Sequence, residues 1–513
     1  MTNTLFVTDD RMLKHRCEWD SHHIERPQRL NQILCKLKSS GILNECKILN
    51  SRFATKDELL MVHDEEYVQK MKNTSALTME ELEDFSSGFE DIYVNESTYE
   101  AATLSAGCAL ELTSEVWKSG KGANGFAAIR PPGHHSSQDQ ACGFCIFNNV
   151  VLCAKQAIAD GASRVLIIDW DIHAGQGTQY AIADDPRIRL ISIHRYENGK
   201  FWPQLEESAT KNKYENTLNV TLNELGYGDF DYAAIYNSII LPVIAEWNPD
   251  IILVSCGFDA AIGDCEGQMT VSPYGFAWMT GLVANQEIPL VLLLEGGYFV
   301  EGIGENALTV LRSLVDRKSP HLHSSDHRVS EHLLKSIARA LFVMEKNWNI
   351  RLIDTINSIR DAKNLLKLTE DMTSEYDSVR EFSLPYPTRN VYPPQLESVN
   401  KYFEKQLYEL MEERKQNKGQ ELQIVLNKQT TTIEFTINER NYVLHLQSQF
   451  ELVFCFNFIL LPLSLKFQLK TNVDTFKLSD YQDHFETLKH GDCSLSEKLI
   501  EEISLMPQID GLF

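Results

Sequence analysis

Short apolar runs rich in β-branched residues alternate with stretches of helical periodicity between about residues 120 and 300. Strands buried on both faces have such continuous apolar runs, and their alternation with helices is typical of βα units around a parallel sheet. We therefore expect an α/β fold. The predicted strands are Gly125–Arg130, Val165–Asp169, Ile188–Ile193, Ile251–Ser255 and Leu290–Leu294, and the predicted helices are Asn149–Ala159, Tyr232–Trp247 and Val329–Trp348.

The pattern changes after the last of these helices. Clustered prolines between Pro385 and Pro394 indicate an irregular connection. Apolar residues then recur at helical spacing from Val399 to Met411. We divide the chain into an α/β domain (1–355), a linker (356–397) and a small C-terminal α+β module (398–513).

Within the C-terminal module, Ile433, Phe435 and Ile437 alternate with polar neighbours and predict a strand. Asn438–Asn441 can turn the chain into a second strand at Tyr442–Leu446.

Length and charge support two domains and limit the partners. A single core rarely grows beyond roughly 250–300 residues, and the chain has 513. Its 48 Lys and Arg residues against 72 Asp and Glu residues give a formal charge of -24. This charge disfavours direct contact with nucleic acid and favours cationic small molecules or basic protein segments.

The sequence also bears on the compartment. Eleven scattered cysteines, an odd number, are typical of reduced thiols. The N-terminus lacks the basic and apolar segments of a secretory signal. The run Leu452–Leu465 is shorter than the about 20 apolar residues of a membrane helix, so we assign it to the core. We expect a cytoplasmic protein, with the nucleus as a second location, and no membrane contact.

Four loops that follow predicted strands carry polar, chemically useful residues. In open parallel sheets, ligands bind beyond the carboxyl ends of the strands, so these loops should meet at one rim. They are Pro131-Pro-Gly-His134-His135, Asp169-Trp-Asp171-Ile-His173, Cys256-Gly-Phe-Asp259 and Glu295-Gly-Gly-Tyr298.

Alternating residues on an extended segment point the same way, so Asp171 and His173 can face one metal ion, with Asp169 free to orient a neighbour. Asp259 would complete two carboxylates and one imidazole, leaving a position for water as a catalytic zinc requires. Ordinary loop residues are the alternative, and this ligand set does not exclude iron or cobalt.

The other loops offer proton chemistry. Imidazole titrates near neutral pH, so one of His134 and His135 can take a proton from water and later deliver it to a leaving amine. Tyr298 can donate its hydroxyl to a carbonyl oxygen as negative charge develops there. Taken alone, Tyr298 is better explained as a packed aromatic residue after a strand.

Together these motifs resemble the zinc-dependent histone deacetylases, class II, in unbroken order over about residues 5–350. The matching stretches are Arg130-Pro-Pro-Gly-His-His135, Gly143-Phe-Cys-Ile-Phe-Asn-Asn149, Asp169-Trp-Asp-Ile-His173, Ser192-Ile-His-Arg-Tyr196, Gly257-Phe-Asp-Ala260 and Leu294-Glu-Gly-Gly-Tyr298. The resemblance implies an arginase/deacetylase fold, in which an eight-stranded parallel sheet lies between helices.

The resemblance also implies roles for individual residues. Asp171, His173 and Asp259 match the zinc ligands, His134 and His135 the catalytic pair, Asp169 the carboxylate that orients His134, and Tyr298 the carbonyl-polarising tyrosine. Gly143 and Phe144 match one wall of the acyl-lysine tunnel and Trp202 the opposing aromatic residue. A structural potassium ion would use Asp169 and Ser192 with the backbone of Asp171 and His173. One departure is Ala174, where the family usually has a second histidine.

Glu266 indicates the substrate. It follows Asp259 closely, and the polyamine deacetylase subfamily carries glutamate at this place. A carboxylate at the tunnel mouth attracts a second ammonium group on the substrate, and Trp202 can add a cation–π contact of roughly 0.5–2 kcal/mol. The first loop argues against this assignment, because Asp20–Ile24 is shorter than in that subfamily and lacks its helical turn.

We therefore expect an acetylated polyamine as substrate, and three alternatives stay open. The enzyme can act on acetyl-lysine in histones or other proteins. A manganese ureohydrolase shares the Asp-x-Asp-x-His spacing, although the histidine pair and Tyr298 argue against it. A catalytically weak scaffold is supported by Ala174 alone.

Overall fold

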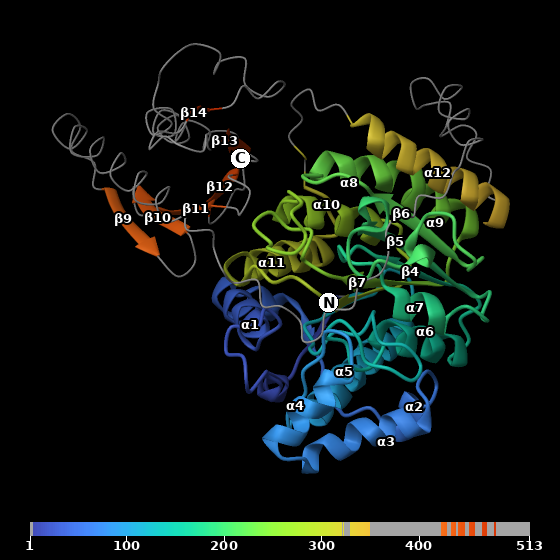
Figure 1. The fold of residues 1–513 in the computed structure, drawn as a ribbon. Coiled ribbons are helices and arrows are strands. Elements are labelled where there is room, and N and C mark those ends of the chain that lie inside the picture. The colour runs from blue at the N-terminus through green and yellow to red at the C-terminus, as the bar shows by residue number, and fades with distance from the viewer. Residues whose placement is uncertain are drawn as a thin grey trace, which may run out of the picture. The chain divides into compact units, whose positions relative to one another are not determined.

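The computed structural model describes residues 4–320, 322 and 329–348, and the backbone of six strands between residues 422 and 478 (Figure 1). The chain divides into two compact units, of which the first contains residues 4–320 and 329–348. The predicted boundaries of the linker and the helical pattern at Val399–Met411 fall outside the described residues and stay predictions.

The first unit is built on one eight-stranded parallel sheet, as predicted. Its strand order is β2-β1-β3-β8-β7-β4-β5-β6. The strands are β1 (Thr4–Val7), β2 (Lys47–Ile48), β3 (Asn124–Ala127), β4 (Val165–Asp169), β5 (Ile188–Arg195), β6 (Thr217–Leu222), β7 (Ile251–Cys256) and β8 (Leu290–Leu294).

The central strands explain why the apolar runs could be recognised. Every residue of β4, β7 and β8 is buried, since helices cover both faces of the sheet. β3 ends at Ala127, earlier than predicted, because Arg130 lies in the following loop and pairs with the buried carboxylate of Glu25. β5 runs two residues further than predicted, to Arg195.

Helices pack on both faces of the sheet (Figure 1). α5 and α6 contact β1, β3, β4, β7 and β8 from one side, and α1, α10 and α11 pack together on the other. The helices are α1 (Gln28–Ser40), α2 (Lys56–Leu59), α3 (Glu65–Asn73), α4 (Met79–Ser87), α5 (Thr98–Ser119), α6 (Asn149–Ala159), α7 (Gln176–Ala181), α8 (Asp229–Ile235), α9 (Leu241–Trp247), α10 (Pro273–Ala284), α11 (Val300–Asp316) and α12 (Glu331–Trp348).

The helices predicted from periodicity are present. α6 has the predicted bounds, and α12 begins two residues later than predicted. The stretch Tyr232–Trp247 lies in α8, a π-helical turn at Tyr236–Ile240 and α9. Among the helices of the described residues, none combines the length and apolarity that crossing a membrane would need.

The second unit contains a six-stranded antiparallel meander. The predicted strand pair is present, since Ile433 pairs with Leu444, Phe435 with Tyr442 and Ile437 with Arg440. The strands are β9 (Leu422–Asn427), β10 (Thr432–Ile437), β11 (Arg440–Leu446), β12 (Glu451–Phe456), β13 (Ser464–Gln468) and β14 (Lys477–Leu478).

Candidate active site

Three predicted metal ligands converge beyond the carboxyl ends of β4 and β7. Asp171, His173 and Asp259 are buried, and one donor atom from each lies within 4.8 Å of the others. Nδ1 of His173 is 3.2 Å from Oδ1 of Asp171 and 3.1 Å from Oδ2 of Asp259. Burial and the neighbouring carboxylate of Asp171 raise the pKa of Asp259 well above its ordinary value. Two buried carboxylates this close favour a cation between them.

Backbone groups orient both carboxylates. Oδ1 of Asp259 accepts the N–H of Ile172 (2.7 Å), and Oδ2 of Asp171 accepts that of Gly296 (2.8 Å). This approach needs glycine, because a Cβ at Gly296 would lie 2.4 Å from Asp259 Oδ2 and 2.6 Å from Asp171 Oδ2. The Gly-Gly sequence before Tyr298 therefore lets the backbone reach the ligand carboxylates.

His134 and His135 lie side by side with ring centroids 3.8 Å apart. Nδ1 of His134 is 2.9 Å from Oδ2 of Asp169, the residue predicted to orient it. Burial opposes a charge on His134, but the carboxylates of Asp171 and Asp169 outweigh it and hold the pKa of this imidazole well above its ordinary value. Burial and the neighbouring His134 lower the pKa of His135 well below its ordinary value. Their surroundings thus shift the pKa values of the two imidazoles in opposite directions.

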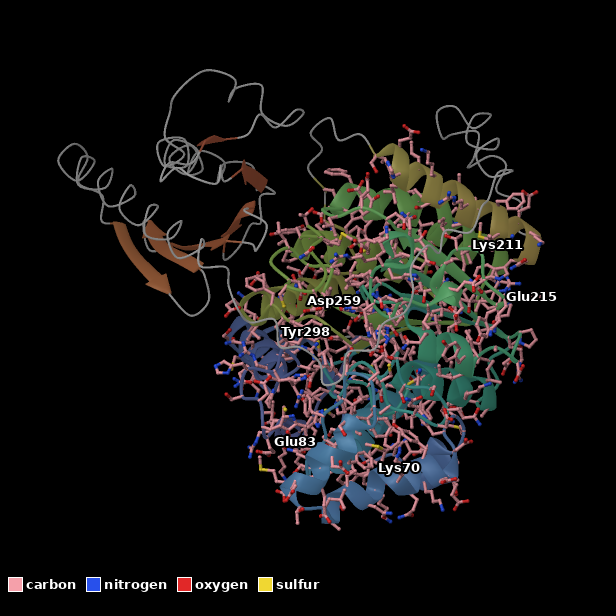
Figure 2. The ribbon with its side chains drawn as sticks, in the orientation of Figure 1. Lys70, Glu83, Lys211, Glu215, Asp259 and Tyr298 are labelled. Atoms are coloured by element: carbon pink, nitrogen blue, oxygen red, sulfur yellow. The ribbon has the colours of Figure 1, made fainter. Side chains whose placement is uncertain are left out.

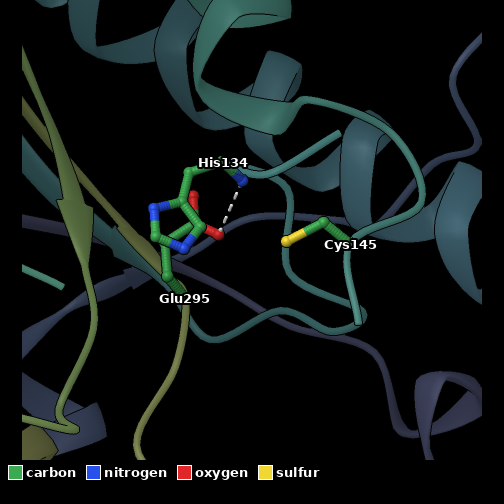
Figure 3. Close-up of side chains that lie close together, drawn as sticks. All are labelled: His134, Cys145 and Glu295. Atoms are coloured by element: carbon green, nitrogen blue, oxygen red, sulfur yellow. Dashed lines mark hydrogen bonds between the residues drawn. The ribbon is translucent and has the colours of Figure 1, made fainter. Parts of the chain in front are cut away.

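Glu295 supports the loop that carries this pair. Its Oε2 accepts the backbone N–H groups of Gly133 (2.7 Å) and His134 (3.2 Å), the second of which is dashed in Figure 3. Figure 3 also shows Cys145 beside them. Burial is the main cause that raises the pKa of the Cys145 thiol well above its ordinary value. Burial also raises the pKa of Glu295 to about 7. We therefore assign Glu295 to loop support.

Tyr298 follows β8, and Figure 2 labels it beside Asp259. Its ring packs edge-on against Phe144, with centroids 5.8 Å apart, and the guanidinium of Arg29 lies 5.0 Å from the ring centroid. Burial raises the pKa of Tyr298 well above 10, so the phenol keeps its proton at neutral pH. It is therefore available as a hydrogen-bond donor.

Two of the predicted tunnel residues, Gly143 and Trp202, lie against His135. A Cβ at Gly143 would lie 2.6 Å from both His135 Cδ2 and Trp202 Cη2, so glycine is needed there. Trp202 meets His135 edge-on at 4.7 Å between centroids, and its Nε1 donates to Oε1 of Glu90 (3.1 Å). Phe201, which sequence reasoning missed, stacks on His173 at 5.2 Å with an interplanar angle of 20°.

Glu266 lies in a loop held from two sides. Nη1 of Arg195 donates to the Glu266 carbonyl (2.9 Å), and Asp264 Oδ1 accepts its backbone N–H (2.9 Å). One carboxylate oxygen of Glu266, Oε1, is buried and accepts no hydrogen bond from the described residues. A buried carboxylate oxygen without a donor is costly, which suits a site for a cationic ligand group.

The residues of the predicted potassium site come from adjacent strands. Asp169 at the end of β4 pairs in register with Ser192 of β5, and Ser192 Oγ lies 2.8 Å from Nδ1 of His194. Potassium binding stays a prediction.

Ala174, which stands where the family usually has a second histidine, is buried, and its carbonyl accepts the N–H of Gln176 (2.9 Å).

Comparisons with known proteins agree with this arrangement. The family model described as histone deacetylase domain matches residues 23–314. Polyamine deacetylase HDAC10 of Homo sapiens is 39% identical over 356 residues, which cover 67% of this chain and 53% of that protein. Histone deacetylase clr3 of Schizosaccharomyces pombe is 37% identical over 319 residues, which cover 59% of this chain and 46% of that protein.

Among solved structures, the crystal structure of the HDA15 HD domain matches with a TM-score of 0.62 and 33% identity, covering 70% of this chain and 98% of that one. The sheet and this match give the arginase/deacetylase fold expected from the sequence. The matched region spans about half the length of the two curated relatives. From its motifs, its fold and its relatives, the chain belongs to the histone deacetylase family.

Proposed function

We propose that this protein is a zinc-dependent amidohydrolase that removes acetyl groups from amines, with N-acetylated polyamines as preferred substrates. The observation that carries the reaction is the convergence of Asp171, His173 and Asp259 beside an imidazole pair. Metal-assisted hydrolysis of an amide uses these groups together.

The residues present fit a divalent cation. One N–H at His173 Nδ1 cannot donate well to two carboxylate oxygens at once, whereas a cation can bind all three side chains. Two carboxylates and an imidazole are a donor set of catalytic zinc. Zinc bound by them supplies Lewis acidity towards a carbonyl and towards water.

The proton steps follow from the hydrogen bonds of the pair. Nδ1 of His135 lies 2.7 Å from Oε1 of Gln176, so Nδ1 carries the proton and Nε2 is left to accept one from the attacking water. His134, held by Asp169 and packed against His135 at 3.8 Å between ring centroids, supports this step from beside the base. Tyr298 donates to the carbonyl oxygen, the C–N bond breaks, and the imidazole pair returns a proton to the departing amine. The products are acetate and the free amine.

Glu266 supports a polyamine as the substrate. Its buried Oε1 lacks a donor among the described residues, and a second ammonium group along the substrate would provide one. Several relatives are named polyamine deacetylases, which agrees with this choice.

Deacetylation of acetyl-lysine in proteins is the second candidate. The first loop favours this candidate. Asp20–Ile24 forms only a turn, in which the His23 N–H donates to the Asp20 carbonyl (3.3 Å). It therefore contains no helical turn that would narrow the entrance to the tunnel. Relatives named histone deacetylases also occur.

Hydrolysis of N8-acetylspermidine and of an acetyl-lysine peptide separates the two candidates. For the polyamine substrate, Glu266→Gln removes the charge at nearly constant size, and we expect kcat/KM to fall by about tenfold or more with little change for the peptide. Equal loss on both substrates, or no loss on the polyamine, would remove Glu266 from substrate selection.

A further inference from the structure

Asp264 is a buried carboxylate that accepts backbone N–H groups from two separate loops. Its Oδ1 accepts those of Glu266 (2.9 Å) and Gly267 (3.3 Å). Its Oδ2 accepts those of Tyr298 (2.6 Å) and Phe299 (3.2 Å). We name residues 263–268 the gate loop and residues 295–299 the tyrosine loop. One side chain thus joins the loop of Glu266 to the loop of Tyr298.

Close packing holds the gate loop where this junction needs it. A Cβ at Gly263, whose φ is +93°, would lie 2.7 Å from the Phe299 ring. A Cβ at Gly267 would lie 1.8 Å from the carbonyl oxygen of Asp259. The gate loop is therefore in contact with the tyrosine loop at one end and with the backbone of a predicted metal ligand at the other.

The chemistry of the junction requires a carboxylate. Each oxygen of Asp264 serves one loop, whereas an amide has one acceptor oxygen and would turn its NH₂ group towards the N–H groups of the other loop. Asp264 is only 4% exposed, so the site accepts an acidic side chain at a cost in stability. That cost is explained if both loops must be held together.

We propose that Asp264 is a positioning residue that sets the hydroxyl of Tyr298 and the carboxylate of Glu266 relative to one another. This inference rests on the proposed function, in which Tyr298 polarises the carbonyl and Glu266 selects a cationic substrate. Rate and substrate preference are then coupled through one side chain, and loss of Asp264 lowers both.

The first test compares Asp264→Asn with a matched control. Oδ2 of Asp250 accepts the N–H groups of Ser163 (2.8 Å) and Arg164 (2.9 Å) at the amino ends of the strands, so Asp250→Asn removes a similar carboxylate away from the site. The substrates are N8-acetylspermidine and an acetylated alkylamine of similar length without further amines. We expect Asp264→Asn to lower kcat about tenfold or more on both and to reduce the preference for acetylspermidine. Asp250→Asn should change neither by more than about twofold. Equal effects of the two variants would overturn the proposal.

Double-mutant cycles measure whether the effect of Asp264 depends on Tyr298 and on Glu266, which a merely structural role would not produce. In a Tyr298→Phe background, Asp264→Asn should change kcat on the uncharged substrate by no more than about twofold, because the hydroxyl that it positions is already absent. In a Glu266→Gln background, it should no longer change the substrate preference. Full additivity in both cycles would overturn the proposal.

The cycles also separate this inference from the proposed function. If Glu266→Gln keeps the wild-type substrate preference, the proposed polyamine selection fails, and so does the inference that Asp264 positions Glu266. The cycle with Tyr298→Phe still decides whether Asp264 positions the Tyr298 hydroxyl. If Asp264→Asn does not fold, hydrogen exchange of the wild-type protein takes its place. The segments Glu266–Gly267 and Tyr298–Phe299 should show the same free energy of opening, because their N–H groups share one acceptor side chain. Independent opening of the two loops would overturn the junction.

Discussion

Nδ1 of His135 and Oε1 of Gln176 lie 2.7 Å apart, and the amide nitrogen of Gln176 in turn donates to Sγ of Cys142 (3.4 Å). The second contact fixes which way the amide points, and the amide oxygen fixes the proton of His135 on Nδ1. The hydrogen bond to Gln176 thus leaves Nε2 of His135 as the proton acceptor, while burial and the neighbouring His134 lower the pKa of this imidazole.

Replacing Gln176 by alanine should lower kcat by about tenfold to a hundredfold, because His135 then loses the partner that holds its tautomer and orientation. Steady-state kinetics and metal analysis check this, and the metal content should stay unchanged. Gln179→Ala is the control, since Gln179 lies on the same helix and donates to Glu207 instead. Equal kcat in the two variants would contradict the role of Gln176.

Tyr298→Phe should lower kcat by about a hundredfold or more with little change in KM, because its hydroxyl is needed where charge develops on the carbonyl oxygen. The ring contacts to Phe144 and Arg29 do not use the hydroxyl, so thermal stability should be nearly unchanged. A variant with wild-type kcat would show that Tyr298 is only a packed aromatic residue.

Glu25→Gln should destabilise the fold by about 3–5 kcal/mol, because it leaves two buried guanidinium groups without their counter-ion. Glu25 pairs with Arg29 at 2.9 Å and with Arg130 at 2.6 Å, and all three side chains are buried. The free energy of unfolding in denaturant measures the loss. The control is Glu111→Gln at the partly exposed pair with Arg52, which should cost under about 1 kcal/mol. Similar losses would contradict the importance of this buried cluster.

Asp229 should make stability depend on pH in the acidic range. Burial raises its pKa to about 6, despite hydrogen bonds from the N–H and hydroxyl of Ser272. The folded state therefore binds the proton more tightly, so stability from this group falls as pH rises from about 4 through about 6. The predicted fall is about 2–3 kcal/mol.

Asp229→Asn should lack this fall, because Asn can keep both contacts with Ser272 and does not titrate. Denaturant unfolding of both proteins at several values between pH 4 and 7 checks it. The difference in stability should grow in favour of the variant as pH rises. Parallel curves would contradict the account.

The sequence predicted most where a local pattern decides the structure. β4, β7 and β8 each begin with four or more consecutive apolar residues. Asp171, His173 and Asp259 follow two of these strands, so their meeting point could be inferred from the parallel topology. β2 has only two residues, both exposed, and offers no such pattern.

The supporting residues could not be assigned in this way. Glu295 stands within a quoted motif and Asp264 lies two residues before Glu266, yet their roles depend on backbone N–H groups that arrive from residues 162 and 34 positions away. Gln176 is three residues from His173 but acts on His135, and Phe201 precedes the predicted Trp202 in the sequence. These contacts follow from tertiary packing, which residue spacing does not encode.

The most direct test of the central claim is the metal content of purified protein, measured together with acetate release. The account predicts about one divalent ion per chain, loss of activity on chelation, recovery on adding zinc, and loss of both ion and activity in Asp259→Ala. Folded protein that holds no such ion yet releases acetate, or an Asp259→Ala variant that keeps full activity, would contradict it.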